Sequence, residues 1–448
     1  MKRPLIGLLV VFFFFGVVGP GKSNGLEKQI ALKEAVKTAL EENHDLRAMG
    51  NRLFAQEADI GMARSAFLPK IAFEERATRT NNPPTAFMMK LNQGRFSQSD
   101  FEIGSLNNPQ PVTDLQTLLT LEQPLYDPKV SLGLAMAQKE HAAQNESYYR
   151  KKEELTLKVA RVYLQVHTAK AFIEVSQKAL EDAREHLRVV EVRYKNGLGL
   201  YSDILRASTA VTSAEQQMVS AEKNLAVSKR MLGLLLGKTD PLDTDDQNIS
   251  LPLNPINYYT GASEGRKDLK ALKMRHENAQ STVKLAEAKY FPTIHLGGTY
   301  QLNDHNTPLG SEGKSWLLSA ALRWDLFDGM NRKYERAKAL QTVKETEELL
   351  KGLDQMVSFK IHEAYLTVQE AQKNAELARA ALKTAEEGQR LVKSRYENSL
   401  SPLVDFLDVQ VHLNQARADR VAKENEYLFA LIHLGFESGT ILKDLNIE

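Results

Sequence analysis

One segment of this chain occurs twice, and each copy ends a long heptad pattern. The first copy, residues 193–198, reads RYKNGL and the second, residues 395–400, reads RYENSL, so matched residues lie 202 positions apart. Before the first copy, mostly apolar residues between 155 and 194 recur in steps that alternate between four and three. A period of 3.5 residues predicts an α-helix that supercoils against a partner helix. We therefore expect two copies of one long helical hairpin, each folded back at such a tip.

The first long helix is predicted to begin at Asp127 and Pro128, because aspartate is a good N-cap and proline is favoured at the first helical position. It would run to about Lys195. At 1.5 Å per residue, nearly 70 residues make a helix roughly 100 Å long. The second long helix ends at Tyr396 and has more alanine along its seam. Helices of this length are longer than a globular domain needs and are typical of an elongated protein that spans the distance between two sites.

A shorter helix and two strands precede the first long helix. Residues 31–67 have apolar positions at helical spacing, and Pro69 ends that pattern. Residues 70–79 and 114–125 are predicted to be strands. The segment between them, residues 81–111, is rich in Asn, Pro, Gly and Ser and is expected to be a loop.

The second copy repeats this order more clearly. A helix over residues 269–290 is followed by strands over 293–303 and 315–326, in which apolar and polar residues alternate. One face that suits lipid and one wet face are typical of a transmembrane barrel strand. Trp316 and Trp324, the only tryptophans, lie near the two ends of one strand. Their position predicts the aromatic girdles found at membrane interfaces.

The first copy is longer than the second. Leu46 matches Leu269 at an offset of 223, whereas Leu125 matches Leu326 at an offset of 201. The additional 22 residues must lie between Pro69 and Leu125. Because insertions concentrate in exposed loops, we expect an external loop there.

The N-terminus has the pattern of a secretory signal. Lys2 and Arg3 precede an apolar run over residues 5–18, which is shorter than the ~20 residues of a membrane span. We expect cleavage before Leu26; an uncleaved anchor helix is the alternative. No other stretch is apolar enough to span as a helix, so a membrane location would require strands. The absence of cysteine excludes an N-terminal lipid anchor.

The chemistry-bearing residues do not form a catalytic pattern. The formal net charge is +1, which does not favour nucleic acid as a partner. The sequence has no Ser/His/Asp constellation, phosphate loop or zinc signature. His295 and His305 lie on or near one strand, but no acidic or cysteine residue is predicted to complete a ligand set with them, so no metal, cofactor or enzyme activity is predicted.

We divide the chain into five parts. They are a signal peptide (1–25), a first repeat (26–237), an equatorial linker (238–262), a second repeat (263–437) and a tail (438–448). Four strands per chain cannot close a barrel, since open sheet edges are not tolerated in lipid and the smallest single-chain barrels have about 8 strands. The predicted fold is mainly α with a small β part: a long coiled-coil barrel plus a transmembrane β-barrel shared between subunits.

The duplicated Arg-Tyr-x-x-(Gly/Ser)-Leu tips, the Phe/Leu-Pro ends of the first helices and the Leu-aromatic-Asp joints resemble the TolC family of outer-membrane efflux proteins. The resemblance covers essentially the whole mature chain. It implies a homotrimer whose strands form a 12-stranded barrel in the outer membrane of a Gram-negative bacterium, with an α-helical tunnel in the periplasm. It also implies docking on a periplasmic adaptor and, with it, an inner-membrane transporter. The chain would then be a passive exit duct for efflux or type I secretion.

The same resemblance implies a gate. It places a pore constriction at Asp405 and Asp408, where three chains would gather six carboxylates and favour cations. It places gate links at Asp203 and Tyr396. The alternative for these acids is that they complement the dipole at a helix start.

One position departs from the family pattern. Ser401 stands where the best-known member has an arginine. A link that holds the channel shut is therefore expected through Arg206 or Arg395 instead.

The tips themselves are expected to contact the adaptor. The candidate positions are Gly197, Leu198, Ser399 and Leu400, since residues at the end of a hairpin are exposed to solvent. The alternative is that these residues serve only the geometry of the turn, above all Gly197.

A non-pore periplasmic coiled-coil adaptor is the alternative function. Such a protein would have one hairpin flanked by compact β-domains. Two hairpins and four amphipathic strands argue against it. The cargo, whether drug, metal ion or polypeptide, is left open by the sequence.

Overall fold

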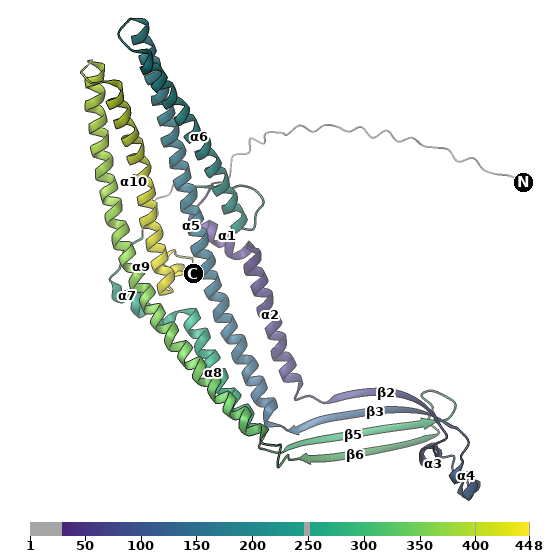
Figure 1. The fold of residues 1–448 in the computed structure, drawn as a ribbon. Coiled ribbons are helices and arrows are strands. Elements are labelled where there is room, and N and C mark those ends of the chain that lie inside the picture. The colour runs from purple at the N-terminus through teal and green to yellow at the C-terminus, as the bar shows by residue number, and fades with distance from the viewer. Residues whose placement is uncertain (1–28, 246–250, 399, 448) are drawn as a thin grey trace, which may run out of the picture.

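Long helices join a four-stranded sheet at one end of the molecule to two hairpin tips at the other (Figure 1). The structure is a computed structural model that describes residues 29–245, 251–398 and 400–447. The expected signal peptide lies outside the described residues.

The two copies share the order helix, strand, strand, long helix and returning helix, and the first copy begins with an additional short helix. The first contains α1 (Leu32–Glu42), α2 (His44–Ser65), β2 (Lys70–Thr80), β3 (Val112–Tyr126), α5 (Pro128–Lys195) and α6 (Tyr201–Leu235). The second contains α8 (Lys267–Ala288), β5 (Thr293–Asp304), β6 (Gly313–Arg323), α9 (Asn331–Glu397) and α10 (Leu403–Ser438). Short elements complete the chain: β1 (Gln29–Ile30), β4 (Asp243–Thr244), α7 (Ile256–Ala262), η2 (Ser263–Gly265) and α11 (Ile441–Asp444).

Among the described residues, no helix combines the length and the apolar character that crossing a bilayer would require.

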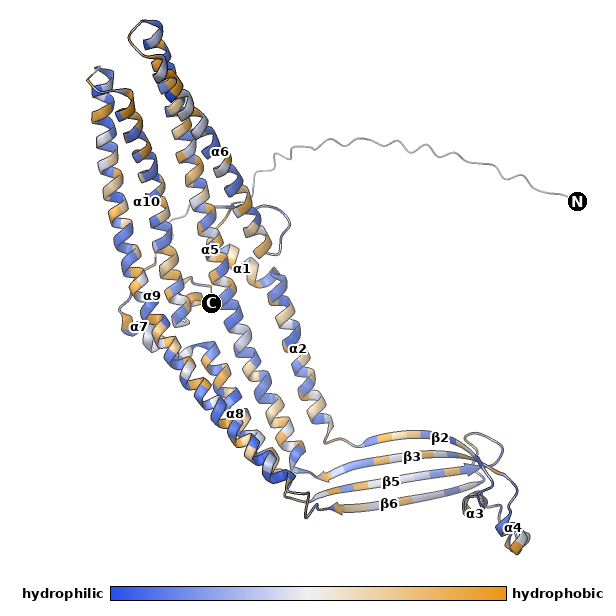
Figure 2. Cartoon of the chain, viewed as in Figure 1, coloured by the Kyte–Doolittle hydropathy of each residue, from blue (hydrophilic) through white to orange (hydrophobic). Residues whose placement is uncertain are grey.

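The predicted long helices are confirmed. Helix α5 has 68 residues and α9 has 67. The Asp127 carboxylate accepts a hydrogen bond from the backbone N–H of Lys129 at 2.9 Å, and Pro128 is the first helical residue. Apolar and polar residues alternate along both helices, as Figure 2 shows. The buried positions of α5 include predicted seam residues: Leu155, Val159, Val162, Val166, Ala169, Ser176, Ala183 and Val190.

The strands form one antiparallel sheet in the order β2-β3-β5-β6, so β2 and β6 are its edges. The register aligns apolar residues across all four strands. One row is Phe73, Leu119, Tyr300 and Trp316; the next is Ile71, Leu121, Gly298 and Leu318. Because alternate residues point to the same face, both rows share one face. That apolar face is open in the single chain, where Trp316 is 77% exposed.

The segment expected to be a loop, residues 81–111, instead contains α3 (Pro83–Asn92), η1 (Gln98–Phe101) and α4 (Ile103–Asn107). The prediction of a loop missed these short helices because it gave too little weight to local helix signals. Asn82 caps α3 by accepting from the backbone N–H of Thr85 at 3.3 Å, and Ala86 and Met89 pack on Val112.

This inserted segment packs against the polar face of the sheet. Gln93, 1% exposed, donates to the Asp114 carboxylate at 2.8 Å. Asn303 donates to the other oxygen of Asp114 at 2.8 Å. Asp114 and Asn303 occupy strand positions opposite to the apolar rows, so the insertion lies on the face away from those rows.

The helix expected over residues 31–67 is broken in two. Asn43 ends α1 and caps α2, because its side chain accepts from the backbone N–H of Leu46 at 3.1 Å. The same side chain donates to the carbonyl of Leu235 at 2.9 Å, which ties the break to the end of α6. A contact with the distant helix α6 therefore fixes a break that local periodicity did not reveal.

Equivalent hydrogen bonds join strand to helix in both copies. Trp324 donates its indole N–H to the carbonyl of Tyr290 at 3.0 Å. Gln123 donates to the carbonyl of Phe67 at 2.8 Å. Gln123 and Trp324 match at the offset of 201, and Phe67 and Tyr290 at 223. Different side chains thus make the same joint between sheet and helical body.

The main core lies midway along the molecule, where α5 meets α1 and the end of α6. Val159, Tyr163 and Val166 of α5 pack with Val36 and Leu232 there. A buried charge cluster adjoins it: Arg150 pairs with Glu153 at 2.7 Å and donates to the carbonyl of Phe436 at 3.0 Å. Burial raises the pKa of Glu153 despite this pairing.

Candidate gate at the hairpin tips

The first tip is a glycine turn between α5 and α6. Gly197 has φ +72°, the left-handed conformation that favours glycine. The backbone N–H of Leu198 donates to the carbonyl of Arg193 at 2.8 Å and that of Gly197 to Tyr194 at 2.9 Å, which closes the helix end in a Schellman pattern. Leu198 is 74% exposed and Leu200 67%. The expected turn role of Gly197 and the exposure of Leu198 are therefore compatible within one tip.

The second tip joins α9 to α10. Leu400 is 70% exposed, and its backbone N–H donates to the carbonyl of Arg395 at 2.8 Å. Helix α10 begins at Leu403 with Pro402 as its N-cap. Ser399, one of the expected adaptor contacts, lies outside the described residues.

The two tips are joined through Tyr396, which is only 8% exposed. Its ring stacks on that of Phe406 with centroids 5.5 Å apart and planes at 8°. The Arg193 guanidinium lies over the Tyr396 ring, with its central carbon 4.8 Å from the ring centroid. Arg193 also donates to the Tyr396 carbonyl at 3.3 Å. The end of α5 is therefore attached to the end of α9 within one chain.

His186 of α5 packs against the same cluster. Its ring and that of Phe406 meet edge to face with centroids 4.5 Å apart. The His186 Nε2 atom is buried without a hydrogen-bond partner among the described residues. Burial lowers the pKa of His186 below its ordinary 6.5, as does Lys393, whereas Asp182 and Glu185 act in the opposite direction. A neutral ring thus packs on Phe406, and a proton would place a charge in an apolar contact.

A polar cluster joins α5, α9 and α10 further from the tips than the Tyr396–Phe406 contact. Gln410 of α10, 6% exposed, donates to Asp182 of α5 at 3.0 Å and accepts from Gln389 of α9 at 3.1 Å. Lys178 lies 3.4 Å from the Asp182 carboxylate. The second hairpin is thereby held against α5 by a hydrogen bond as well as by ring packing.

The two aspartates of the expected constriction lie on the exposed side of α10. Asp405 accepts a hydrogen bond from the Ser401 hydroxyl at 2.9 Å, and Asp408 lies about one turn further along. Ser401 thus orients Asp405 locally. The pore role of both acids stays a prediction, since it depends on neighbouring chains.

The expected gate links are not formed within this chain. No hydrogen bond or ion pair joins Asp203 to Tyr396 among the described residues, and the side chains of Arg206 and Arg395 make none there either. Links between chains stay a prediction. Within the chain the link is made by Arg193, the repeat mate of Arg395.

Sequence reasoning assigned no role to Arg193 or His186. Arg193 was visible as the first residue of the repeated tip motif. His186 carried no such signal, because it is set beside Phe406 only by packing of α5 on α10.

Comparisons with known proteins identify the family of this chain. The family model described as outer membrane efflux protein matches residues 35–238 and 259–439. The chain belongs to the outer membrane efflux protein family. This confirms the expected TolC-like fold, the role as an outer-membrane exit duct and the location in the outer membrane of a Gram-negative bacterium. The family consists of efflux channels rather than enzymes.

Individual relatives are distant. The chain is 25% identical to protein CyaE of Bordetella pertussis over 413 residues, 88% of this chain and 80% of that relative. It is 24% identical to nodulation protein T of Rhizobium leguminosarum bv. trifolii, over 60% of this chain and only 59% of that relative. The solved outer membrane protein VceC from Vibrio cholerae is 18% identical with a TM-score of 0.74, covering 93% of this chain and 97% of that chain. At that identity the likeness concerns the fold.

Proposed function

We propose that three copies of this chain pool their sheets into one 12-stranded barrel and their helical hairpins into one tunnel. The supporting observation is the sheet itself. Each edge strand, β2 or β6, pairs on one side alone within the described part of the chain, and the apolar rows are open to solvent in the single chain. Sheet edges cannot remain open in lipid, so a neighbouring copy must pair with each edge.

In this assembly the apolar rows face outer-membrane lipid. Trp316 and Trp324, 77% and 54% exposed, then lie near the two membrane interfaces as girdle residues. The inserted α3 segment, which packs on the opposite face, lies on the inside of the barrel.

The duct is passive, and its partners supply cargo and energy. We infer that the exposed tips, with Leu198 and Leu400, contact a periplasmic adaptor that links the duct to an inner-membrane transporter. Large exposed apolar side chains at the far end of a long hairpin suit such a contact. We propose that the chain is organised as two repeats, residues 26–237 and 263–437, joined by a linker over residues 238–262.

Native mass spectrometry of the detergent-purified protein and conductance in planar bilayers test the proposal together. We expect a trimer that survives detergent and forms ion-conducting pores. A monomer without conductance would favour the non-pore adaptor.

A further inference from the structure

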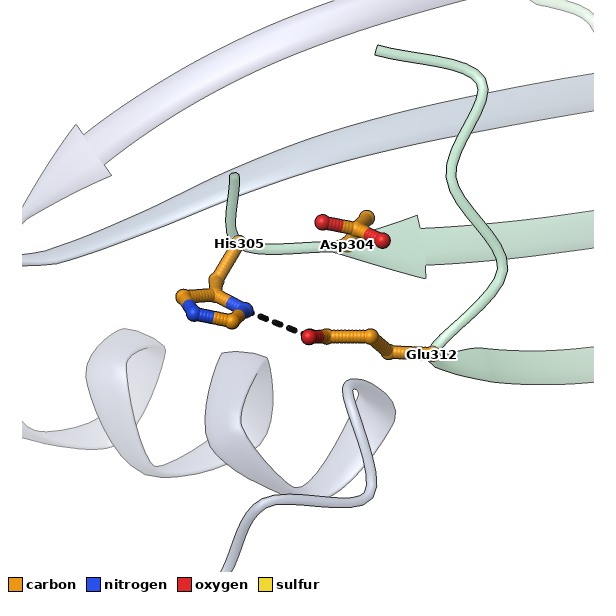
Figure 3. A group of neighbouring side chains, drawn as sticks. All are labelled: Asp304, His305 and Glu312. Atoms are coloured by element: carbon orange, nitrogen blue, oxygen red, sulfur yellow. Dashed lines mark hydrogen bonds and ion pairs between the residues drawn. The ribbon is translucent and has the colours of Figure 1, made fainter. Parts of the chain in front are cut away.

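A mixed set of nitrogen and oxygen ligands lies in the loop between β5 and β6, far from the tips. Figure 3 shows Asp304 at the end of β5, His305 next to it and Glu312 just before β6. One ligand atom from each of the three lies within 4.8 Å of the others. The prediction of no metal rested on a lack of acidic neighbours for His305. Asp304 is in fact adjacent to it in the sequence, and the hairpin turn brings in Glu312.

The three side chains are held in different ways. His305 Nδ1 lies 2.6 Å from a Glu312 carboxylate oxygen. Asp304 as a whole residue is only 7% exposed. Its Oδ1 accepts from the backbone N–H groups of Asn306 at 2.8 Å and Thr307 at 2.9 Å. Only backbone N–H groups of the described residues donate to Asp304, so its carboxylate keeps lone pairs available for a metal ion.

The environment of His305 also suits coordination. Its Nε2 contacts the Asn306 side-chain amide, so Nδ1 carries the ring proton toward Glu312. Coordination through Nδ1 would require the neutral ring to carry its single proton on Nε2 instead, and the Asn306 amide to turn its oxygen toward that proton. Asn306 would then fix the tautomer, as partners of metal-bound histidines commonly do.

The ligand types restrict the choice of ion. Two carboxylates and one imidazole give the loop a formal charge of −2 when the ring is neutral, which a divalent ion balances. An imidazole ligand favours zinc and related transition metals over magnesium or calcium, which prefer oxygen throughout. Three protein ligands leave a fourth position for water in a tetrahedral site.

We propose that Asp304, His305 and Glu312 bind one Zn²⁺ ion per chain. The ion would join the end of β5 to the start of β6. The inserted segment adjoins this loop, because a Cβ on Gly313 would lie 1.6 Å from the Asn92 carbonyl oxygen. A zinc ion here therefore stiffens the turn on which the end of α3 rests.

Calorimetric titration of the chelator-treated, detergent-purified full chain with ZnCl₂ tests this site. We expect one saturable site per chain whose affinity falls at least about tenfold in His305→Ala and in Glu312→Gln. His295→Ala is the matched control, since His295 is also on β5 but belongs to no such group among the described residues.

Two further measurements separate this site from others. Asp405→Ala with Asp408→Ala must leave zinc binding intact, because the predicted pore acids could also attract cations. Cu²⁺ bound in place of zinc should show nitrogen coupling in electron paramagnetic resonance that disappears in His305→Ala. Equal zinc affinity in the wild type and His305→Ala, loss of binding only in the pore-acid variant, or no saturable binding would each overturn the proposal.

Discussion

Arg193 and Tyr396 link the two hairpins although they are not repeat mates. The guanidinium carbon of Arg193 lies 4.8 Å from the Tyr396 ring centroid, and its Nη1 donates to the Tyr396 carbonyl. The repeat mates are instead Tyr194, which is 43% exposed, and Arg395, which is also exposed. The arginine of the first copy of the motif therefore contacts the tyrosine of the second copy, and the other arginine and tyrosine do not form the matching contact. Contacts of this kind contribute about 0.5–2 kcal/mol each.

Arg193→Ala should raise the open probability of the channel in planar bilayers, because it removes both links from α5 to Tyr396. Arg395→Ala is the matched control, since the Arg395 side chain has no ion pair or hydrogen bond among the described residues. Arg193→Lys should give an intermediate result, because lysine keeps the charge but loses the planar stacking group. If Arg395→Ala opened the channel and Arg193→Ala did not, links between chains would control the gate.

Acid should weaken the tip cluster through His186. Its folded pKa is lower than the ordinary 6.5, so the state in which the tips separate binds more protons. The contribution of this packing is complete above about 6.5 and is lost as the pH falls through the lower folded value. Conductance should therefore rise with acidification in that window. His186→Gln should flatten the response, whereas His412→Gln, at an exposed position of α10, should leave it unchanged.

Asp405→Ala combined with Asp408→Ala should reduce cation preference and block by multivalent cations, if both acids line the pore of the proposed trimer. Reversal potentials across a salt gradient measure this preference. Asp419→Ala removes the same charge from another exposed position of α10 and serves as the control. Unchanged selectivity would mean that the two acids do not face the pore.

The joint between sheet and helices should depend on Arg332 more than on its neighbour Arg336. Arg332 lies 3.0 Å from the Asp328 carboxylate and donates to the carbonyls of Leu326 and Lys289, and its side chain is only 10% exposed. Removing one partner of a buried pair costs about 3 kcal/mol or more. Arg336 pairs with Glu287 at 46% exposure, where such pairs contribute less than about 1 kcal/mol.

Thermal unfolding of Arg332→Met and Arg336→Met compares the two directly. We expect a clear loss of stability only for Arg332→Met. Equal losses would contradict this special role of Arg332 and favour the side-chain hydrogen bonds of Trp324 and Gln123 to the helix ends as the main connection.

The sequence by itself determined the elements whose cause is local or periodic. Heptad spacing gave the lengths of α5 and α9, Asp127 and Pro128 marked where α5 begins, and alternation identified the strands. Duplication supported these predictions, because every element could be compared with its mate. The family resemblance rested on the same repeats, whereas the prediction of a barrel shared between chains rested on the small number of strands.

Only the tertiary structure decided which side chains meet across elements. Asn43 breaks a helix because the distant carbonyl of Leu235 is there to accept from it. Arg193 reaches Tyr396, His186 reaches Phe406, and Glu312 reaches His305, because packing or a hairpin turn brings each pair together. Such contacts depend on the relative rotation and offset of whole helices and strands, which no periodicity in a single segment encodes.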